Sequence, residues 1–333
     1  MPALGFTGDV MLGRLVDEHQ RRRPVDAVWG DLRDRLRALD GLLVNLECAL
    51  STRGEPWRET RHPYLFRADP DWAVPALEAA GVDYCSLANN HLLDFHEPAL
   101  LDTLDHLDGA GVARAGAGRD REEARTPATF TVDTPDGDGI DVACVAFTDN
   151  TPEFAAGPGR PGVAYLDGTG EGSRAVLREA LEAARADDPD LLVASLHWGP
   201  NMVAGPDEGL RDLCRWLAGE GVDVVHGHSA HVFHGVEVHD GSLLCYDMGD
   251  FVDDYAVDAE LRNDRSFLFE VVVAADGTVE ELRLHPTEIH DYAVHEAGER
   301  AATWSRERMV ELSEPFGTTF ERDGAALVCE VAA

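Results

Sequence analysis

The chain has 333 residues, and 44% of them are hydrophobic, so it is long enough to bury the core of one large α/β domain. Asp and Glu total 63 against 28 basic residues, which gives a formal net charge of −35, and every basic residue is Arg. This charge disfavours nucleic acid as a partner, and the lack of Lys excludes a Schiff-base enzyme and a P-loop phosphate site.

The acidic residues are spread along the whole chain, which favours a hydrated surface adapted to a high-salt cytoplasm over a cation-storage surface. No apolar run approaches the roughly 18 residues of a membrane helix, and the start MPALGFTGDV is unlike a secretory signal. We therefore expect a cytoplasmic protein without a membrane anchor. The six Cys residues show no CxxC spacing, which predicts reduced thiols in the core.

Short apolar runs alternate with helical patterns along the chain. The predicted strands of the first part are 4–10, 41–47 and 82–88, and its predicted helices are 28–39, 69–81 and 97–111. A hairpin over 130–147 and a Gly/Pro-rich surface loop over 150–172 follow. A helix is then predicted over 173–188, and strands over 190–199, 222–228, 241–251 and 266–286. This order predicts one α/β domain over residues 1–295, with a helix and strand extension over 296–333 packed on it.

Polar residues stand at the ends of five predicted strands. They are Asp9, Glu47, the run Asn89-Asn90-His91, His197, and the pair His228 and His231. Strand ends of α/β proteins converge on one edge, so we expect these side chains to meet there. Carboxylates, an amide oxygen and imidazoles suit Mn, Fe or Zn ions, and two such ions sharing a carboxylate can activate a water for hydrolysis.

Each residue also has a simpler interpretation. Asp9 could be a turn residue, Asn89-Asn90-His91 could cap the next helix, and His197 could be a satisfied core histidine. His226 alternates with Val225 on the strand itself, which favours a core or supporting role. The metal site is favoured because all of these residues occur together.

The order of these motifs resembles the CapA-type capsule and poly-γ-glutamate synthesis family, a branch of the calcineurin-like metallophosphoesterase superfamily. The similarity runs from about residue 4 to residue 253 and is carried by GDVMLGR, VNLECAL, SLANNHLLDF, HWG, GHSAHV and YDMGDF. The resemblance implies a metallophosphoesterase-like four-layer sandwich, in which two mixed β-sheets are flanked by helices.

The resemblance also implies roles for single residues. Asp9 and His231 would bind a first divalent ion, and Glu47 would bridge the ions where the superfamily usually has Asp. A second ion would take Asn90, His197 and His228. His91 would stabilise or protonate the leaving group. The supporting residues would be Asn89, His226 and Asp250.

Three departures from the family pattern affect these expectations. Met11 stands where the superfamily usually has a His ligand, Ser229-Ala230 replaces His-Pro, and Asp250 replaces Asn. The first site could therefore be weak or empty, so one ion is an alternative to two.

The sequence predicts a metal-dependent hydrolase that cleaves a phosphoester, or an amide, in a small anionic substrate or a γ-glutamyl polymer. Arg14 and Arg265 are the preferred substrate-binding residues, since guanidinium groups bind phosphate or carboxylate at two points. Further candidates are Arg61, His62 and Arg67; all of them could instead be ordinary surface residues. The alternatives are a non-catalytic, metal-stabilised accessory protein of polymer biosynthesis and a polymer-binding module.

Overall fold

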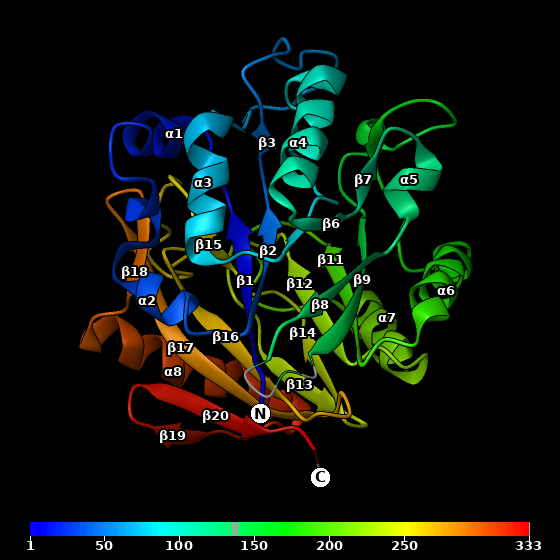
Figure 1. Cartoon of the computed structure of the whole chain (residues 1–333). Coiled ribbons are helices and arrows are strands. Elements are labelled where there is room, and N and C mark those ends of the chain that lie inside the picture. Colours follow the sequence, from blue (N-terminus) through cyan, green and yellow to red (C-terminus); the bar gives the residue numbers. More distant parts are fainter. Residues whose placement is uncertain (135–136, 138, 333) are drawn as a thin grey trace.

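The computed structural model describes residues 1–134, 137 and 139–332. Two large β-sheets lie at its centre, with helices on both outer sides (Figure 1). The larger sheet contains β1 (Ala3–Val10), β2 (Gly41–Leu46), β5 (Tyr84–Ser86), β6 (Ala113–Ala115), β15 (Asp250–Val252), β16 (Arg265–Val273), β17 (Val279–His290), β18 (Ala293–Glu296), β19 (Glu321–Asp323) and β20 (Ala326–Glu330). The smaller sheet contains β8 (Ala128–Val132), β9 (Ile140–Thr148), β11 (Leu191–His197), β12 (Val224–His228), β13 (Val236–His239) and β14 (Ser242–Cys245).

Both sheets are mixed. The larger has the order β19-β20-β17-β16-β1-β2-β5-β6, with β15 beside β1 and β18 beside β17. Its β1, β2, β5 and β6 are parallel, whereas β16, β17 and β20 are antiparallel to their neighbours. The smaller has the order β13-β14-β12-β11-β9-β8, with parallel strands in the centre and an antiparallel pair at each edge. Two short pairs are separate: β3 (Ala49–Leu50) with β4 (Arg67–Ala68), and β7 (Ala117–Gly118) with β10 (Gly162–Val163).

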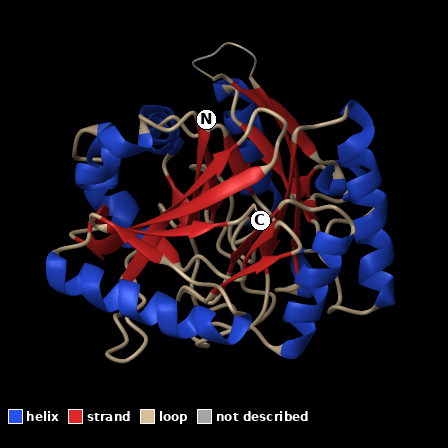
Figure 2. Cartoon of the chain, turned by 90° about the horizontal axis from the view of Figure 1, so that it is seen from below, coloured by secondary structure: helices blue, strands red, loops and turns tan. Residues whose placement is uncertain are grey.

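The helices form the outer layers, which is clearest from below (Figure 2). The α-helices are α1 (Arg14–Gln20), α2 (Arg33–Leu36), α3 (Pro70–Ala80), α4 (His96–Ala110), α5 (Arg121–Arg125), α6 (Glu171–Ala184), α7 (Glu208–Gly219) and α8 (Glu299–Ser313). The 3-10 helices are η1 (Val25–Leu32), η2 (Pro152–Phe154), η3 (Arg185–Asp187) and η4 (Glu314–Phe316).

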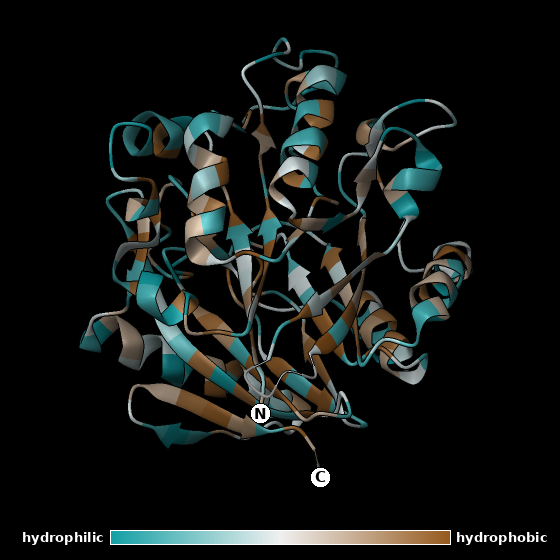
Figure 3. Cartoon of the chain, viewed as in Figure 1, coloured by the Kyte–Doolittle hydropathy of each residue, from teal (hydrophilic) through white to brown (hydrophobic). Residues whose placement is uncertain are grey.

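Alternating side chains along the strands build the layers. In β2, Leu43 faces the smaller sheet, whereas Val44 faces α3 and α4. In β11, Val193 lies between the sheets and Ala194 faces α6 and α7. The central strands are accordingly apolar on both faces, and polar residues lie mainly on the outer helices (Figure 3). The four-layer arrangement of two mixed sheets flanked by helices is confirmed.

Several predicted elements need correction. The helix expected over 28–39 is η1 followed by the short α2, because Gly30 has φ +50° and breaks the helical path. Helices α1 and α7 were not predicted, although Asp207 caps α7 by accepting from the Leu210 N–H. The surface loop expected over 150–172 contains η2 and β10 and buries Phe154 in the core.

The single strand expected over 241–251 is two strands in different sheets. β14 belongs to the smaller sheet, and β15 pairs with β1 in the larger one, so the chain crosses between the sheets at residues 246–249. Where it arrives, the Asp9 N–H donates to the Gly249 carbonyl at 2.9 Å. A Cβ on Gly8 would lie 1.7 Å from this same carbonyl oxygen, so only glycine fits at position 8.

The hairpin expected over 130–147 is confirmed by the antiparallel pair β8 and β9, and residues 135, 136 and 138 of its turn lie outside the described residues. The last segment, expected as an extension from residue 296, contributes α8 beside β17 and β20 paired with β17. The division of the chain at residue 295 stays a prediction. Among the described residues, none of the helices combines the length and apolarity that a membrane span requires.

Candidate metal centre

The ends of the parallel strands in both sheets bring the predicted residues together. Asp9 is on β1, Glu47 follows β2, and Asn90 and His91 follow β5. From the smaller sheet come His197 at the end of β11 and His228 at the end of β12, and these two are register partners. The loop after β12 then supplies His231. The site therefore lies where the carboxyl ends of the two sheets meet.

Two groups of potential ligand atoms occur in this cluster, and both include Asp9. One consists of Asp9, His197 and His228, and the other of Asp9, Glu47 and His231; within each group the atoms lie within 4.8 Å of one another. Glu47 Oε1 is also 3.8 Å from His197 Nε2, so its carboxylate is within reach of both groups. Asn90 follows β5 directly before His91, and its buried Oδ1 has no hydrogen-bond partner among the described residues. Bridging by Glu47, which the resemblance implies, and bridging by Asp9 are both compatible with these positions.

Unsatisfied oxygens test whether the residues fit a cation. Among the residues described, four buried side-chain oxygens of this region have no hydrogen-bond partner: Asp9 Oδ2, Glu47 Oε1, Asn90 Oδ1 and Asp250 Oδ2. Leaving such acceptors buried and unpaired is costly, and two of them belong to Asp9 and Glu47, whose carboxylates repel each other. A divalent ion would satisfy the oxygens and reduce the repulsion, so the donor set fits a metal.

Amide side chains hold Asp9 in place. Asn45 Nδ2 donates to Asp9 Oδ1 at 2.6 Å, and Asn89 Nδ2 donates to Asn45 Oδ1 at 3.2 Å. The oxygen of Asn89 accepts from the His91 N–H at 3.1 Å. Asn89 thus connects the ends of β2 and β5, and its role as a supporting residue stays a prediction.

His91 is oriented by two neighbours. Its Nδ1 lies 2.7 Å from Asp94 Oδ2, and its ring stacks on Phe66 with centroids 3.7 Å apart. Donation from Nδ1–H to the carboxylate leaves Nε2 on the side of Glu47, whose Oε1 is 3.9 Å away. His62 binds the other oxygen of Asp94 at 2.7 Å, so one carboxylate holds two imidazoles.

His231 is strained and strongly polarised. It has φ +61°, a conformation that costs energy outside glycine, and its Nδ1 lies 2.9 Å from Asp250 Oδ1 and 3.3 Å from Asp9 Oδ2. Burial disfavours its charged form, but Asp250, Asp9 and Glu47 outweigh this effect and raise the pKa of His231 well above its ordinary value. Asp250 therefore supports His231 from the strand beside Asp9.

Burial favours the neutral form of His197 and His228. Burial lowers the pKa of His197 to about 3, and burial together with the neighbouring His226 and His197 lowers the pKa of His228 well below its ordinary value. The two rings are tilted by 46° relative to each other, with their Nδ1 atoms 2.9 Å apart. Neutral imidazole is the form that binds metal, so both side chains are already in the required state.

Asp9 and Glu47 differ in their electrostatics although both are fully buried. Burial raises the pKa of Asp9, but interactions with His231, His197 and Asn45 outweigh it and lower the pKa overall. For Glu47, burial and the nearby Asp9 charge raise the pKa well above the ordinary range. Without a cation, Glu47 therefore tends to hold a proton.

His226 lies behind the cluster. Its Nε2 is 2.7 Å from the Thr7 carbonyl oxygen and its Nδ1 is 3.1 Å from Ser195 Oγ, which in turn lies 2.9 Å from His228 Nε2. His226 thus acts on His228 through Ser195 and is outside both donor groups.

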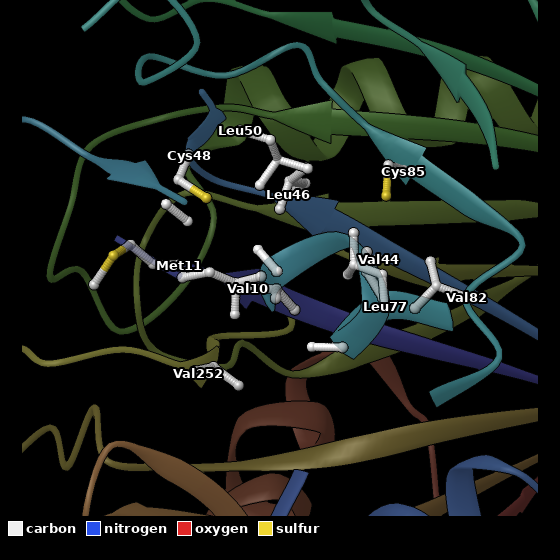
Figure 4. Packing of buried hydrophobic residues seen from close by; sticks show 14 of the residues in the cluster. Val10, Met11, Val44, Leu46, Cys48, Leu50, Leu77, Val82, Cys85 and Val252 are labelled. Atoms are coloured by element: carbon white, nitrogen blue, oxygen red, sulfur yellow. The ribbon is translucent and has the colours of Figure 1, made fainter. Parts of the chain in front are cut away.

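Met11 belongs to a hydrophobic core cluster. Its side chain is fully buried with Val10, Leu46 and Cys48 in the core between the larger sheet and its helices (Figure 4). Position 11 therefore contributes no ligand. Cys48 is buried in the same core, and burial raises the pKa of its thiol to about 12. All six Cys residues are free and buried, as expected from their spacing.

The two predicted arginines lie in different places. Arg14 lies over the rings of Tyr64 and Phe66, at 5.3 and 5.7 Å from their centroids, and Phe66 is the ring that stacks on His91. Arg265 is buried over the Trp304 ring of α8 at 5.2 Å, and its Nε has no hydrogen-bond partner among the described residues. Arg14 is thus near the cluster, whereas the contacts of Arg265 are with α8.

Three residues of the site were missed by the sequence analysis. Asp94 could have been found, because it follows His91 by three residues in SLANNHLLDF. Asn45 is a polar residue within the apolar run GLLVNL, which is a weaker signal. Tyr255, whose hydroxyl donates to Glu47 Oε2 at 3.3 Å, comes from a loop after β15 and gives no local signal.

Comparison with known proteins agrees with the motifs. The family model described as bacterial capsule synthesis protein PGA_cap matches residues 3–255. The probable polyglutamine synthesis accessory protein of Mycobacterium tuberculosis is 33% identical over 298 residues, covering 87% of this chain and 77% of the relative. The PGA biosynthesis protein CapA of Bacillus subtilis is 26% identical, with 86% and 71% covered. The capsule biosynthesis protein CapA of Bacillus anthracis is 26% identical, with 80% and 66% covered.

A crystal structure of the protein TT1561 of Thermus thermophilus matches with a TM-score of 0.39 and 9% identity, over 80% of this chain and 93% of that protein. So low a score supports no conclusion about function. The family match covers most of the chain and includes every residue of both donor groups. The resemblance drawn from the motifs is thereby confirmed, and the chain belongs to the bacterial capsule synthesis protein family PGA_cap.

Proposed function

We propose that this chain is a metal-dependent hydrolase that cleaves a phosphoester or amide bond in an anionic substrate of capsule or poly-γ-glutamate metabolism. The observation that carries the proposal is the set of buried, unpaired oxygens of Asp9, Glu47 and Asn90 beside neutral imidazoles. Buried oxygens without hydrogen-bond partners cost free energy, and such groups concentrate at functional sites.

The two donor groups give the residues that would hold the ions. Asp9, Glu47 and His231 would hold one, and Asp9, His197 and His228 the other, with Asn90 as an additional donor. When bound, Mn, Fe or Zn supplies Lewis-acid activation of water and of the scissile group. Because Met11 faces the core, the first group has only His231 as an imidazole, and a single ion is the alternative.

The side chains around the ions have separate tasks. His91 presents Nε2 toward Glu47 while Asp94 accepts from its Nδ1–H, so Nε2 would give a proton to a leaving group from the charged form of the ring. Burial lowers the pKa of His91, and Asp94 partly offsets this effect. Tyr255 donates to one oxygen of Glu47 and leaves the other free for a cation. Asn45 and Asn89 fix Asp9 through amide hydrogen bonds.

The substrate class follows from the relatives, which are named for polyglutamine synthesis, PGA biosynthesis and capsule biosynthesis. A γ-glutamyl polymer or a small anionic fragment of one is the corresponding substrate here. The word accessory in the name of the Mycobacterium relative favours, as a second candidate, a metal-stabilised protein without turnover. The cytoplasmic location, the adaptation to high salt and the lack of a nucleic-acid partner stay predictions from composition.

Metal content tests the proposal directly. Protein purified without chelator should contain about two ions per chain by mass spectrometry, and His228→Ala should lose at least one of them. The matched control is His106→Ala on α4, outside both donor groups, which should keep the full content. About one ion in the native protein would establish the single-ion alternative. No ion after addition of Mn²⁺ or Zn²⁺ would reject the hydrolase and leave the accessory role.

Metal binding should release protons and strengthen as the pH rises. The pKa values of His231 and Glu47 are raised well above their ordinary values, so the metal-free site holds protons that a cation must displace. Affinity for Mn²⁺ should therefore keep increasing from about pH 5.5 to pH 8. Calorimetry in buffers of different ionisation enthalpy measures the released protons. Asp250→Asn removes a negative charge that raises the pKa of His231, so this variant should release fewer protons when Mn²⁺ binds. An unchanged number of released protons would contradict the assignment of His231 as a group that loses a proton to the cation.

A further inference from the structure

A cavity lined by arginines lies on the other side of the Phe66 ring from His91. Its volume is about 450 Å³, and it lies between α1, the β4 strand and the chain around Ser51 and Thr52. Four of its lining residues are arginines: Arg14, Arg21, Arg22 and Arg67. A concentration of guanidinium groups is unexpected in a chain that has 63 acidic residues and only 28 arginines.

Most acidic side chains that line the cavity already form hydrogen bonds or ion pairs within the protein. Asp17 pairs with Arg21 and also accepts from Trp72 Nε1 at 2.7 Å, and Asp69 accepts from the backbone at the start of α3. Glu18 is exposed and forms no ion pair within the described part of the chain.

The guanidinium groups of Arg14 and Arg67 are held in place but retain free donors. Arg67 lies over the Phe95 ring at 3.9 Å and uses Nη1 for the carbonyls of Arg53 and Gly54. Within the described residues, no carboxylate is within ion-pair distance of Arg67, and the only one near Arg14 is Asp254 at 3.5 Å from its Nε. Stacking on aromatic rings fixes such groups without consuming their N–H donors.

Backbone packing joins the two arginines. A Cβ on Gly13 would lie 2.7 Å from the Arg67 backbone nitrogen, so the residue before Arg14 packs directly against Arg67. The close approach fixes α1 against β4 and keeps both side chains on the same cavity.

One aromatic ring separates the cavity from the centre. Phe66 lies between Arg14 and the His91 ring that it stacks on. On another side, Asp254 binds the Leu15 N–H at 2.8 Å, and the next residue, Tyr255, donates to Glu47. A substrate that extends past Phe66 from the centre would place a neighbouring group in the cavity.

The geometry points to a binding subsite in this cavity for a carboxylate of the substrate, next to the bond that reacts, with Arg14 and Arg67 as its donors. This inference rests on the proposed function, because it takes the metal centre as the reacting end of the same substrate. A chain of γ-linked glutamate residues carries such a carboxylate on every unit. The arginines thereby provide positive charge for an anionic ligand in a chain whose formal net charge is −35.

Calorimetric titration with a γ-linked glutamate oligomer tests the subsite, using metal-loaded and chelated protein. Arg14→Gln and Arg67→Gln should each weaken binding by about tenfold or more. Arg308→Gln changes a half-buried arginine of α8 that is paired with Glu311, and it should not weaken binding. An oligomer with amidated carboxyl groups should not bind. Equal binding by all variants, or binding of the amidated oligomer, would overturn the subsite.

A second variant covers the case in which loss of an arginine disturbs folding. Thr52→Glu adds a negative charge to the lining and leaves both guanidinium groups in place, so it should weaken binding with an unchanged melting temperature. Arginine-dependent binding that survives chelation, in a protein without turnover, would refute the hydrolase but support the subsite. Turnover of the oligomer that is unchanged by all three substitutions would support the hydrolase and refute the subsite.

Discussion

His91→Ala should lower kcat on the chromogenic phosphodiester bis(p-nitrophenyl) phosphate by about 10²–10⁴-fold, with the metal content unchanged. The imidazole is held by Asp94 and by the Phe66 ring, so that Nε2 is presented to the centre at 3.9 Å from Glu47. His91 is outside the two donor groups around Asp9. Its loss should therefore remove proton transfer without removing an ion. Steady-state kinetics and metal analysis of the same preparation measure both effects.

His106→Ala on α4 is the matched control and should retain native kcat. Full activity in His91→Ala would show that the leaving group obtains its proton elsewhere. A parallel loss of metal and activity would instead identify His91 as a ligand, which would use the third group of potential donors, His62, His91 and Asp94.

Gly8→Ala should destabilise the protein by about 3 kcal/mol or more, or prevent it from folding. The new Cβ would lie 1.7 Å from the Gly249 carbonyl oxygen and 2.7 Å from its carbon, and both are backbone atoms that cannot rotate away. Relief requires β1 and the segment before β15 to separate, which would break the 2.9 Å hydrogen bond from Asp9 N–H to Gly249. Urea unfolding followed by circular dichroism gives the change.

Gly109→Ala is a suitable comparison for this effect. Gly109 is inside α4, where a Cβ would meet nothing within 4 Å, so alanine should be neutral or stabilising by up to about 1 kcal/mol. Native stability in Gly8→Ala would mean that the two backbone segments are farther apart than this structure has them.

The sequence predicted which residues gather at the site better than it predicted how the chain connects its strands and helices. Asp9, Glu47, Asn90, His197, His228 and His231 were identified because each stands at the end of an apolar strand, and parallel strands bring their ends together. Their roles as ligands remain predictions that the metal analysis will test.

The parts that could not be predicted depend on contacts between distant segments. The crossing from β14 to β15 follows a run that has the pattern of one continuous strand, and only the packing of Gly249 against Gly8 shows where the chain changes sheets. The break at Gly30 similarly follows from a close approach, since a Cβ there would lie 2.2 Å from the Val294 carbonyl oxygen. Tyr255 reaches Glu47 across 208 residues of sequence.

The division of the cluster between two sheets has a consequence for how the protein folds. Asp9 and Glu47 are on one sheet and His197 and His228 on the other, so neither sheet alone forms a complete donor group with both carboxylate and paired imidazoles. The contacts between Asp9 and His228 span more than half of the chain, and closing such loops is slow. The site should accordingly be among the last regions to form during refolding. A cation present at that stage would lower the rate of unfolding more than it raises the rate of folding, because it stabilises contacts that are absent from the transition state.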